Sequence, residues 1–192
     1  MKIGLFGGSF DPIHSGHLIA AEQVLNKKIC DKIWFIPVYQ NPLKEKLTSE
    51  KHRKKMLELA LKGKKGFELN ETELKKKKTS YSIETIKELK KEFPEHEFYF
   101  ILAEKALNEF NKWREYKKIL EEVKLIIVAV FDSAKIPEEV KKFNPILLQP
   151  TLSSYISSTI IRKGIQEKKD ISVFLPEKVS AYIKKNKLYG FK

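Results

Sequence analysis

Six short apolar runs, each of a length typical of a buried strand, recur along the chain and constrain its fold more than any other feature. They are Lys2 to Phe6, Lys32 to Pro37, Gly66 to Asn70, Glu97 to Leu102, Lys124 to Val130 and Pro145 to Gln149. Helical patterns separate them, as where Leu18, Ala21 and Leu25 share one helix face. Continuous apolar strands that alternate with amphipathic helices indicate a parallel sheet covered on both faces. We therefore expect an α/β fold with a doubly wound parallel sheet.

The last part of the chain changes character. From Thr151 onward it reads as helical, with Pro176 suited to the first position of a final helix. We find no internal repeat and no Gly/Ser linker. The sequence therefore predicts a single domain over residues 1–192, in which residues 151–192 form a mostly helical C-terminal subregion.

The charge of the chain bears on its partners and its compartment. The net charge is +13, but only three of the 38 basic residues are arginine. A coat of lysines favours a solvated surface over specific nucleic-acid recognition, which prefers the bidentate guanidinium. The chain has no long apolar run and no signal-peptide pattern, and its single cysteine, Cys30, has no partner for an intrachain disulfide. We expect a cytoplasmic protein that binds neither nucleic acid nor membranes, and composition does not predict its oligomeric state.

A first anion site is predicted directly after the first strand, where residues 7–17 read GGSFDPIHSGH. Gly7 and Gly8 permit a tight turn and a close approach of the backbone to a ligand. A helix that begins near Ser15, its expected N-cap, presents free N–H groups and the positive end of its dipole. His14 and His17 are three residues apart, so both rings can face the same side and meet a phosphate. The sequence shows no third ligand near this pair, so we predict no metal site.

A second anion site is predicted near the end of the chain, where residues 156–162 read ISSTIIR. Ser157 or Ser158 can cap a short helix, which Gly164 would end. Arg162 follows Ser158 by one helical turn, so hydroxyls, N–H groups and a guanidinium can converge on an anion. Taken alone, the pattern also fits an ordinary helix cap.

Together these two segments resemble the two signatures of the nucleotidyltransferase superfamily, GGxFDPxHxGH and ISSTxIR. The resemblance implies the Rossmann-like fold of that superfamily and a nucleotidyl transfer in which His14, His17 and Arg162 are catalytic. In that superfamily the second histidine contacts the triphosphate around the α-phosphate, and the ISST segment grips the β- and γ-phosphates. ATP binding is accordingly assigned to Gly7, Gly8, Ser9, Phe10, His14, His17, Ser157, Ser158, Thr159 and Arg162.

Further segments resemble the nicotinate-nucleotide adenylyltransferases. These are IPVYQNPLK at 36–44, TSYSIETIKEL at 79–89, and FNKWREYKKIL at 110–120, which contains Trp113. The resemblance implies that ATP and nicotinate mononucleotide react to give deamido-NAD and pyrophosphate in NAD biosynthesis, with Mg²⁺ delivered on ATP. Ser82 would meet the nicotinate carboxylate and Trp113 would stack on the ring. The residues assigned to the acceptor are Asn41, Lys44, Ser82, Trp113 and Arg114.

Two departures from that family keep other functions open. Ala103-Glu104-Lys105 stands where the family has G-x-D against the adenosine, and Val130-Phe131-Asp132-Ser133 stands where it has R-P-G-Y. Loss of that arginine removes a phosphate contact, so either a neighbouring lysine replaces it or the acceptor differs. The alternatives are transfer to nicotinamide mononucleotide or phosphopantetheine, a nucleotide-binding homologue without catalysis, and a nucleic-acid-binding module.

Overall fold

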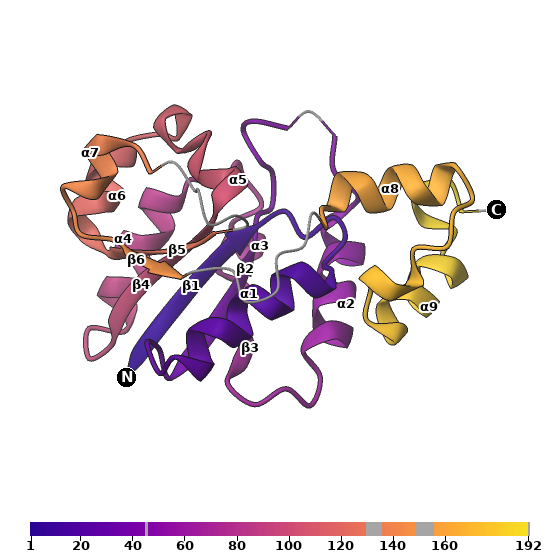
Figure 1. Cartoon of the computed structure of the whole chain (residues 1–192), viewed down its shortest axis with the longest axis horizontal. Helices are drawn as coiled ribbons and strands as arrows, with labels where there is room; N and C mark the ends of the chain where they lie inside the picture. Colours follow the sequence, from indigo (N-terminus) through magenta and orange to yellow (C-terminus); the bar gives the residue numbers. More distant parts are fainter. Residues whose placement is uncertain (45, 130–135, 149–155, 192) are drawn as a thin grey trace.

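The computed structural model describes residues 1–44, 46–129, 136–148 and 156–191, and its centre is a six-stranded parallel sheet (Figure 1). The strand order is β3-β2-β1-β4-β5-β6, and every neighbouring pair is parallel. The strands are β1 (Lys2–Gly8), β2 (Lys32–Pro37), β3 (Phe67–Leu69), β4 (Glu97–Ala103), β5 (Lys124–Val128) and β6 (Ile146–Leu148). This order, with β1 between β2 and β4, confirms the predicted doubly wound α/β class.

Each strand lies within or close to an apolar run of the sequence. β1 is longer than predicted, because it continues through Gly7 and Gly8 and pairs with Ile36 and Pro37 of β2. β3 and β6 are short, as is common for edge strands, which pair on one side only. The predicted ends of β5 and β6 at Val130 and Gln149 lie outside the described residues.

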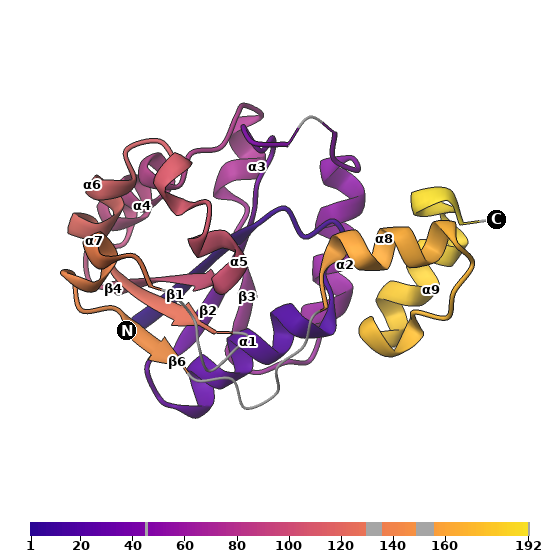
Figure 2. The ribbon, with the colours of Figure 1, turned by 45° about the horizontal axis from the view of Figure 1, so that its top comes forward.

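Helices cover both faces of the sheet (Figure 2). The helices are α1 (Ser15–Asn26), α2 (Glu50–Leu61), α3 (Thr72–Lys76), α4 (Ser82–Glu92), α5 (Glu104–Leu107), α6 (Tyr116–Glu122), α7 (Glu138–Lys141), α8 (Ser158–Gln166) and α9 (Glu177–Lys185). α1 and α2 pack on one face, where Val24 and Met56 are fully buried, and α4 and α6 pack on the other, where Ile86 and Ile119 are. The alternating strands and helices therefore bury two apolar layers, as expected for this class.

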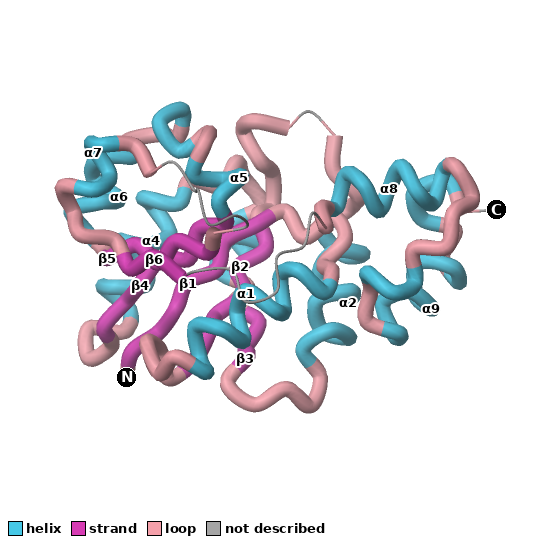
Figure 3. The backbone as a smooth tube through the Cα atoms, in the orientation of Figure 1, coloured by secondary structure: helices cyan, strands magenta, loops and turns pink. Residues whose placement is uncertain are grey.

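The C-terminal helices lie beside α1 and α2, at one end of the molecule (Figure 3). α9 begins at Glu177, with Pro176 as its N-cap, one position from the prediction. Gly164 does not end α8, which continues to Gln166. A Cβ at this glycine would lie 2.5 Å from Cγ2 of Ile171, so Gly164 serves close packing instead.

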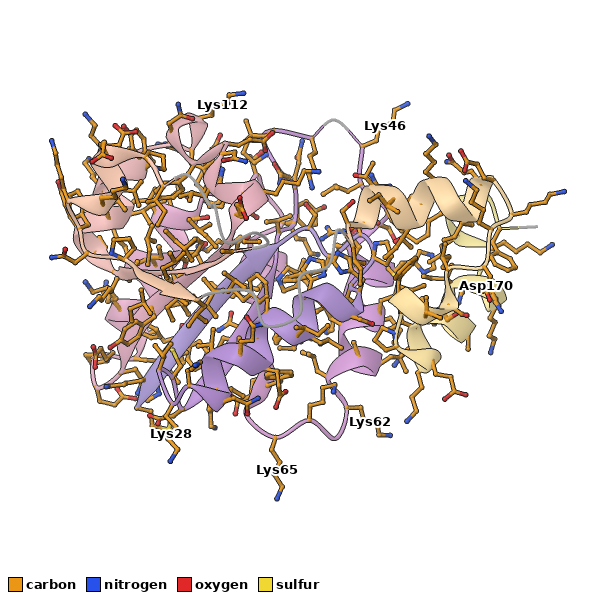
Figure 4. All side chains as sticks on the ribbon, in the orientation of Figure 1. Lys28, Lys46, Lys62, Lys65, Lys112 and Asp170 are labelled. Atoms are coloured by element: carbon orange, nitrogen blue, oxygen red, sulfur yellow. The ribbon has the colours of Figure 1, made fainter. Side chains whose placement is uncertain are left out.

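Many of the numerous lysines extend into solvent. Lys28, Lys46, Lys62, Lys65 and Lys112 point away from the body of the molecule (Figure 4), and all five are exposed. Their arrangement agrees with the predicted solvated lysine coat.

Candidate active site

A cavity of about 760 Å³ lies beyond the carboxyl ends of the central strands. In an open parallel sheet this is where ligands usually bind. Gly7 and Gly8 of β1, Val38 after β2 and Ala103 of β4 all line it. The structure brings every predicted site residue to this cavity, namely Gly7, Gly8, Ser9, Phe10, His14, His17, Asn41, Lys44, Ser82, Trp113, Arg114, Ser157, Ser158, Thr159 and Arg162.

The turn after β1 is built differently from the sequence prediction. Phe10, and neither Gly7 nor Gly8, has the positive φ, at 47°. The Phe10 side chain is buried, and its ring lies edge-on to Phe6 with centroids 5.9 Å apart. A Cβ on Gly8 would come within 3.1 Å of the Phe10 ring, so a larger residue there would push the ring aside by a few tenths of an ångström. Burial of Phe10 therefore offsets the cost of its left-handed backbone.

His14 and His17 lie on the same side of the first turn of α1, as predicted, with ring centroids 3.7 Å apart. The N-cap of α1 is His14, one residue before the expected Ser15. Burial lowers the pKa of His14 to about 4, and burial with the nearby His14 and Lys44 lowers the pKa of His17 well below its ordinary value. Both rings are therefore neutral at neutral pH.

The tautomer of His17 follows from one hydrogen bond. The backbone N–H of His14 donates to Nδ1 of His17 over 3.3 Å. Because Nδ1 is an acceptor, the proton of this neutral ring resides on Nε2. His17 is thereby prepared to donate a hydrogen bond from Nε2 to an anion in the cavity.

The two predicted anion sites touch each other directly. Ser158 Oγ donates to the carbonyl oxygen of Pro12 over 3.0 Å, and Nη1 of Arg162 donates to the carbonyl oxygen of Asp11 over 2.7 Å. Ser157 is the N-cap of α8, since its Oγ accepts from the N–H of Ile160 at 3.3 Å. The free N–H groups of α8 and the guanidinium of Arg162 thus adjoin the loop after β1.

The segment after β2 reaches the same loop. Nδ2 of Asn41 and Nζ of Lys44 both approach Ser9 Oγ, at 3.4 and 3.3 Å. Burial, and next the charge of Arg162, lower the pKa of Lys44. Since neighbouring cations disfavour one another, an anion that enters between Lys44 and Arg162 relieves their repulsion.

An aromatic wall closes another side of the cavity. Trp113 follows the 3-10 turn η1 (Phe110–Lys112) and is held edge-on by Phe100 and Phe110, at centroid distances of 6.1 and 5.5 Å. Ser82 is the first residue of α4. The guanidinium of Arg114 lies 4.7 Å from the centroid of the Tyr81 ring and is paired with a glutamate of α4, Glu84. Its backbone N–H has no acceptor among the residues that the structure describes, which leaves that donor for a ligand.

The sequence reasoning missed Arg53 of α2, which is 1% exposed. Its guanidinium donates three hydrogen bonds of 2.9 Å each, to the carbonyl oxygens of Ser9, Tyr39 and Thr48. One buried side chain thus ties together three segments around the cavity. A signal was available, because Arg53 shares the helix face of Met56 and other apolar residues, where a charged residue needs a specific partner.

Part of the cavity lining is apolar. It includes Gly16, Ile19 and Ala20 of α1 and Ile101 and Val128 of the sheet. An apolar lining suits a planar base better than a phosphate.

Of the two segments that depart from the family pattern, only the first lies within the described residues. Ala103 and Lys105 line the cavity, at the end of β4 and the start of α5. Val130, Phe131 and Asp132 lie outside the described residues. Within 1–44, 46–129, 136–148 and 156–191, we find no cluster of three or more His, Cys, Asp or Glu side chains suited to a metal, and no helix long and apolar enough to cross a membrane.

Comparisons with known proteins agree over nearly the whole chain. The cytidylyltransferase-like family matches residues 5–164. A protein of Oceanobacillus iheyensis, named "probable nicotinate-nucleotide adenylyltransferase", is 37% identical over 99% of this chain and 97% of its own. A protein of the same name from Bacillus licheniformis is 35% identical, over 98% of both chains.

Solved structures are similar as well. The nicotinic acid mononucleotide adenylyltransferase of Plasmodium falciparum, in complex with NaAD, is 25% identical and superposes with a TM-score of 0.83. The alignment covers 100% of this chain and 98% of that one. The same enzyme in complex with APC gives a TM-score of 0.84.

Proposed function

Because the chain belongs to the nicotinate-nucleotide adenylyltransferases, within the cytidylyltransferase-like family, we propose that it transfers the adenylyl group of ATP to nicotinate mononucleotide. The products are deamido-NAD and pyrophosphate. One observation carries this proposal beyond the family: Ser158 and Arg162 bond directly to Pro12 and Asp11, so that two anion-binding segments face one cavity. Two such segments together suit a triphosphate better than a single phosphate.

The reaction is a displacement at the α-phosphorus of ATP. An oxygen of the acceptor's 5′-phosphate forms a new bond to this phosphorus, and the bond from the phosphorus to the oxygen that bridges to the β-phosphate breaks. Pyrophosphate leaves with that electron pair. The attacking phosphate is already ionised at neutral pH, so the protein supplies alignment and charge stabilisation in place of a strong base.

We assign these tasks to three side chains. His17 donates from Nε2, and Arg162 offers the guanidinium hydrogens that are not used on Asp11. His14, whose ring lies against His17, assists in holding the phosphates. Mg²⁺ bound to ATP would neutralise charge on the phosphates.

The acceptor is proposed to bind across the aromatic wall. A flat indole suits a pyridinium ring, and the Ser82 hydroxyl with the backbone N–H of Arg114 suits the nicotinate carboxylate. Asn41 and Lys44, which both approach Ser9, are our candidates to hold the acceptor's phosphate. The apolar part of the cavity lining, which includes Gly16 and Ala20, would take the adenine.

Lys105 is our candidate for the cation that replaces the missing family arginine. It is exposed, lines the cavity and has no ion pair with a described residue. Its charge contributes to lowering the pKa of Lys44, so the two ammonium groups act on one region. An acceptor phosphate between them would gain two charge-assisted contacts.

The domain organisation and the cellular location of the chain can also be inferred. We propose a single domain, since α8 and α9 share an apolar core with α1 and α2. A cytoplasmic location is supported by the single cysteine, which needs no oxidising compartment.

The decisive experiment measures pyrophosphate release by the purified protein with Mg·ATP and a panel of acceptors. We expect the protein to use nicotinate mononucleotide in preference to nicotinamide mononucleotide and phosphopantetheine. Release with another acceptor alone would correct the substrate, and ATP binding without release from any acceptor would indicate a homologue without catalysis.

A matched pair of variants then tests the site. His17→Ala should lower kcat at least about a hundredfold, as does loss of a contact made to developing charge. His52→Ala is the control, because His52 lies outside the cavity and bonds Tyr182. Full activity of His17→Ala would refute its assigned role.

A further inference from the structure

A tyrosine close to the end of the described chain bonds to the loop after β1. Tyr189 lies in the 3-10 turn η3 (Leu188–Gly190), beyond residues 5–164 that match the family. Its hydroxyl donates to Oδ1 of Asp11 over 2.8 Å. This contact joins two residues that are 178 positions apart.

Asp11 is the residue on which Arg162 is anchored. Its side chain is 4% exposed, and Oδ2 accepts from the backbone N–H of Thr48 at 3.1 Å. Its carbonyl oxygen accepts Nη1 of Arg162 at 2.7 Å. Tyr189 and Arg162 therefore act on the same residue, one through the carboxylate and the other through the main chain.

Tyr189 is suited to hold a carboxylate without adding charge to the cavity. Its side chain lies outside the lining of the cavity, so it does not meet a nucleotide there. Burial, and next the charge of Asp11, raise the pKa of Tyr189, which keeps the hydroxyl protonated as a donor. A buried carboxylate oxygen that loses its donor is costly, so Asp11 would be held less firmly without the Tyr189 hydroxyl.

We propose that Tyr189 is a positioning residue, which fixes Asp11 and through it the guanidinium of Arg162. The turn at 188–190 would then complete the phosphate site although it contacts no substrate. This inference rests on the proposed function, in which Arg162 contacts the triphosphate.

The chain offers a matched pair of variants for the test. Tyr189→Phe removes only the hydroxyl, which holds Asp11 and also lies 3.9 Å from Sδ of Met56. Tyr182→Phe removes a hydroxyl from α9 that lies 2.9 Å from Nδ1 of His52, also outside the cavity. Both variants lose one hydroxyl of the C-terminal region, so a merely structural role predicts similar, small losses of thermal stability and of activity from both.

We expect Tyr189→Phe alone to lower kcat about tenfold and to weaken ATP binding several-fold, the scale of one disturbed charge-assisted hydrogen bond. The KM for nicotinate mononucleotide should stay unchanged. In an Arg162→Lys background the same substitution should have little further effect, because the two residues act as a unit. Wild-type kinetics in Tyr189→Phe, an equal loss in Tyr182→Phe, or full additivity with Arg162→Lys would each overturn the proposal.

Direct measurement of ATP affinity separates this inference from the proposed function. If the wild-type protein releases no pyrophosphate with any acceptor, the proposed function fails. The dissociation constants of ATP for the two phenylalanine variants still decide the role of Tyr189, since weaker binding by Tyr189→Phe alone supports it and equal binding refutes it.

Discussion

Acid should destabilise this protein through His14, and the structure gives the size of the effect. The pKa of His14 falls from 6.5 to about 4 on burial, so the unfolded chain binds the proton more readily than the native one. Between these two values the unfolding free energy therefore rises with pH, so stability falls as the pH is lowered. The contribution of neutral His14 to stability is fully present above pH 6.5 and lost below about pH 4.

The magnitude follows from linkage. Each unit of pKa difference is worth about 1.4 kcal/mol, so lowering the pH from about 7 to about 4.5 should remove about 2 kcal/mol through His14 alone. The lowered pKa of His17 acts in the same direction and adds to the loss in the wild type. For a domain whose total stability is on the order of 10 kcal/mol, this is a measurable fraction.

The assay is urea unfolding of the wild type and of His14→Asn at both pH values, followed by circular dichroism. Asparagine is a good N-cap and keeps the backbone N–H that bonds His17, so the native fold should persist. Any pH-independent gain or loss cancels when the two falls in stability are compared. The fall should be about 2 kcal/mol smaller in the variant. An equal fall in both proteins would refute the reasoning.

Three further predictions concern the cavity. Arg53→Lys should raise the KM for ATP, lower kcat and reduce the melting temperature, because an ammonium cannot hold three carbonyls in the planar pattern of a guanidinium. Steady-state kinetics and thermal melting test this prediction, and unchanged kinetics would contradict it. Trp113→Ala should raise the KM for nicotinate mononucleotide about tenfold and leave the KM for ATP unchanged. Trp113→Phe should raise the KM for nicotinate mononucleotide less, because a phenyl ring still stacks. Equal changes in KM for both substrates would argue against stacking. Lys105→Met should raise the acceptor KM about tenfold and weaken its dependence on salt. Lys62→Met, at an exposed lysine outside the cavity lining, should not, and equal effects of the two variants would remove Lys105 from the site.

Local patterns predicted the sheet well because the strands are buried on both faces. Phe98 and Phe100 point to one face of β4 and Ile101 to the other, so the run reads as continuously apolar and its limits are visible in the sequence. The two candidate anion-binding segments were predictable for a similar reason. Glycines, histidines and helix caps act within a few residues of one another, and such local chemistry is encoded in spacing.

Contacts between distant segments were not predictable from spacing. Nothing near Arg53 in the sequence indicates that its partners are the carbonyls of Ser9 and Tyr39, since any backbone offers a carbonyl. Likewise, the left-handed turn falls on Phe10 because its ring finds space under Gly8, and only the packed structure contains that space. The candidate residues could be identified from sequence, whereas the groups that hold them in place could not.

The pairing of β1 with β4 bears on how the molecule folds. Lys2 lies opposite Glu97, so this ladder closes a long loop of chain, and the entropic cost of closure must be met before the contacts form. The loop that leads to His14 and His17 extends from β1, and Arg162 contacts Asp11 of this loop from still farther along the chain. The nucleotide site is therefore complete only when these distant segments have come together. Bound ATP should accordingly slow unfolding and leave the rate of refolding nearly unchanged, because the ligand recognises an arrangement that appears only after the folding barrier has been crossed.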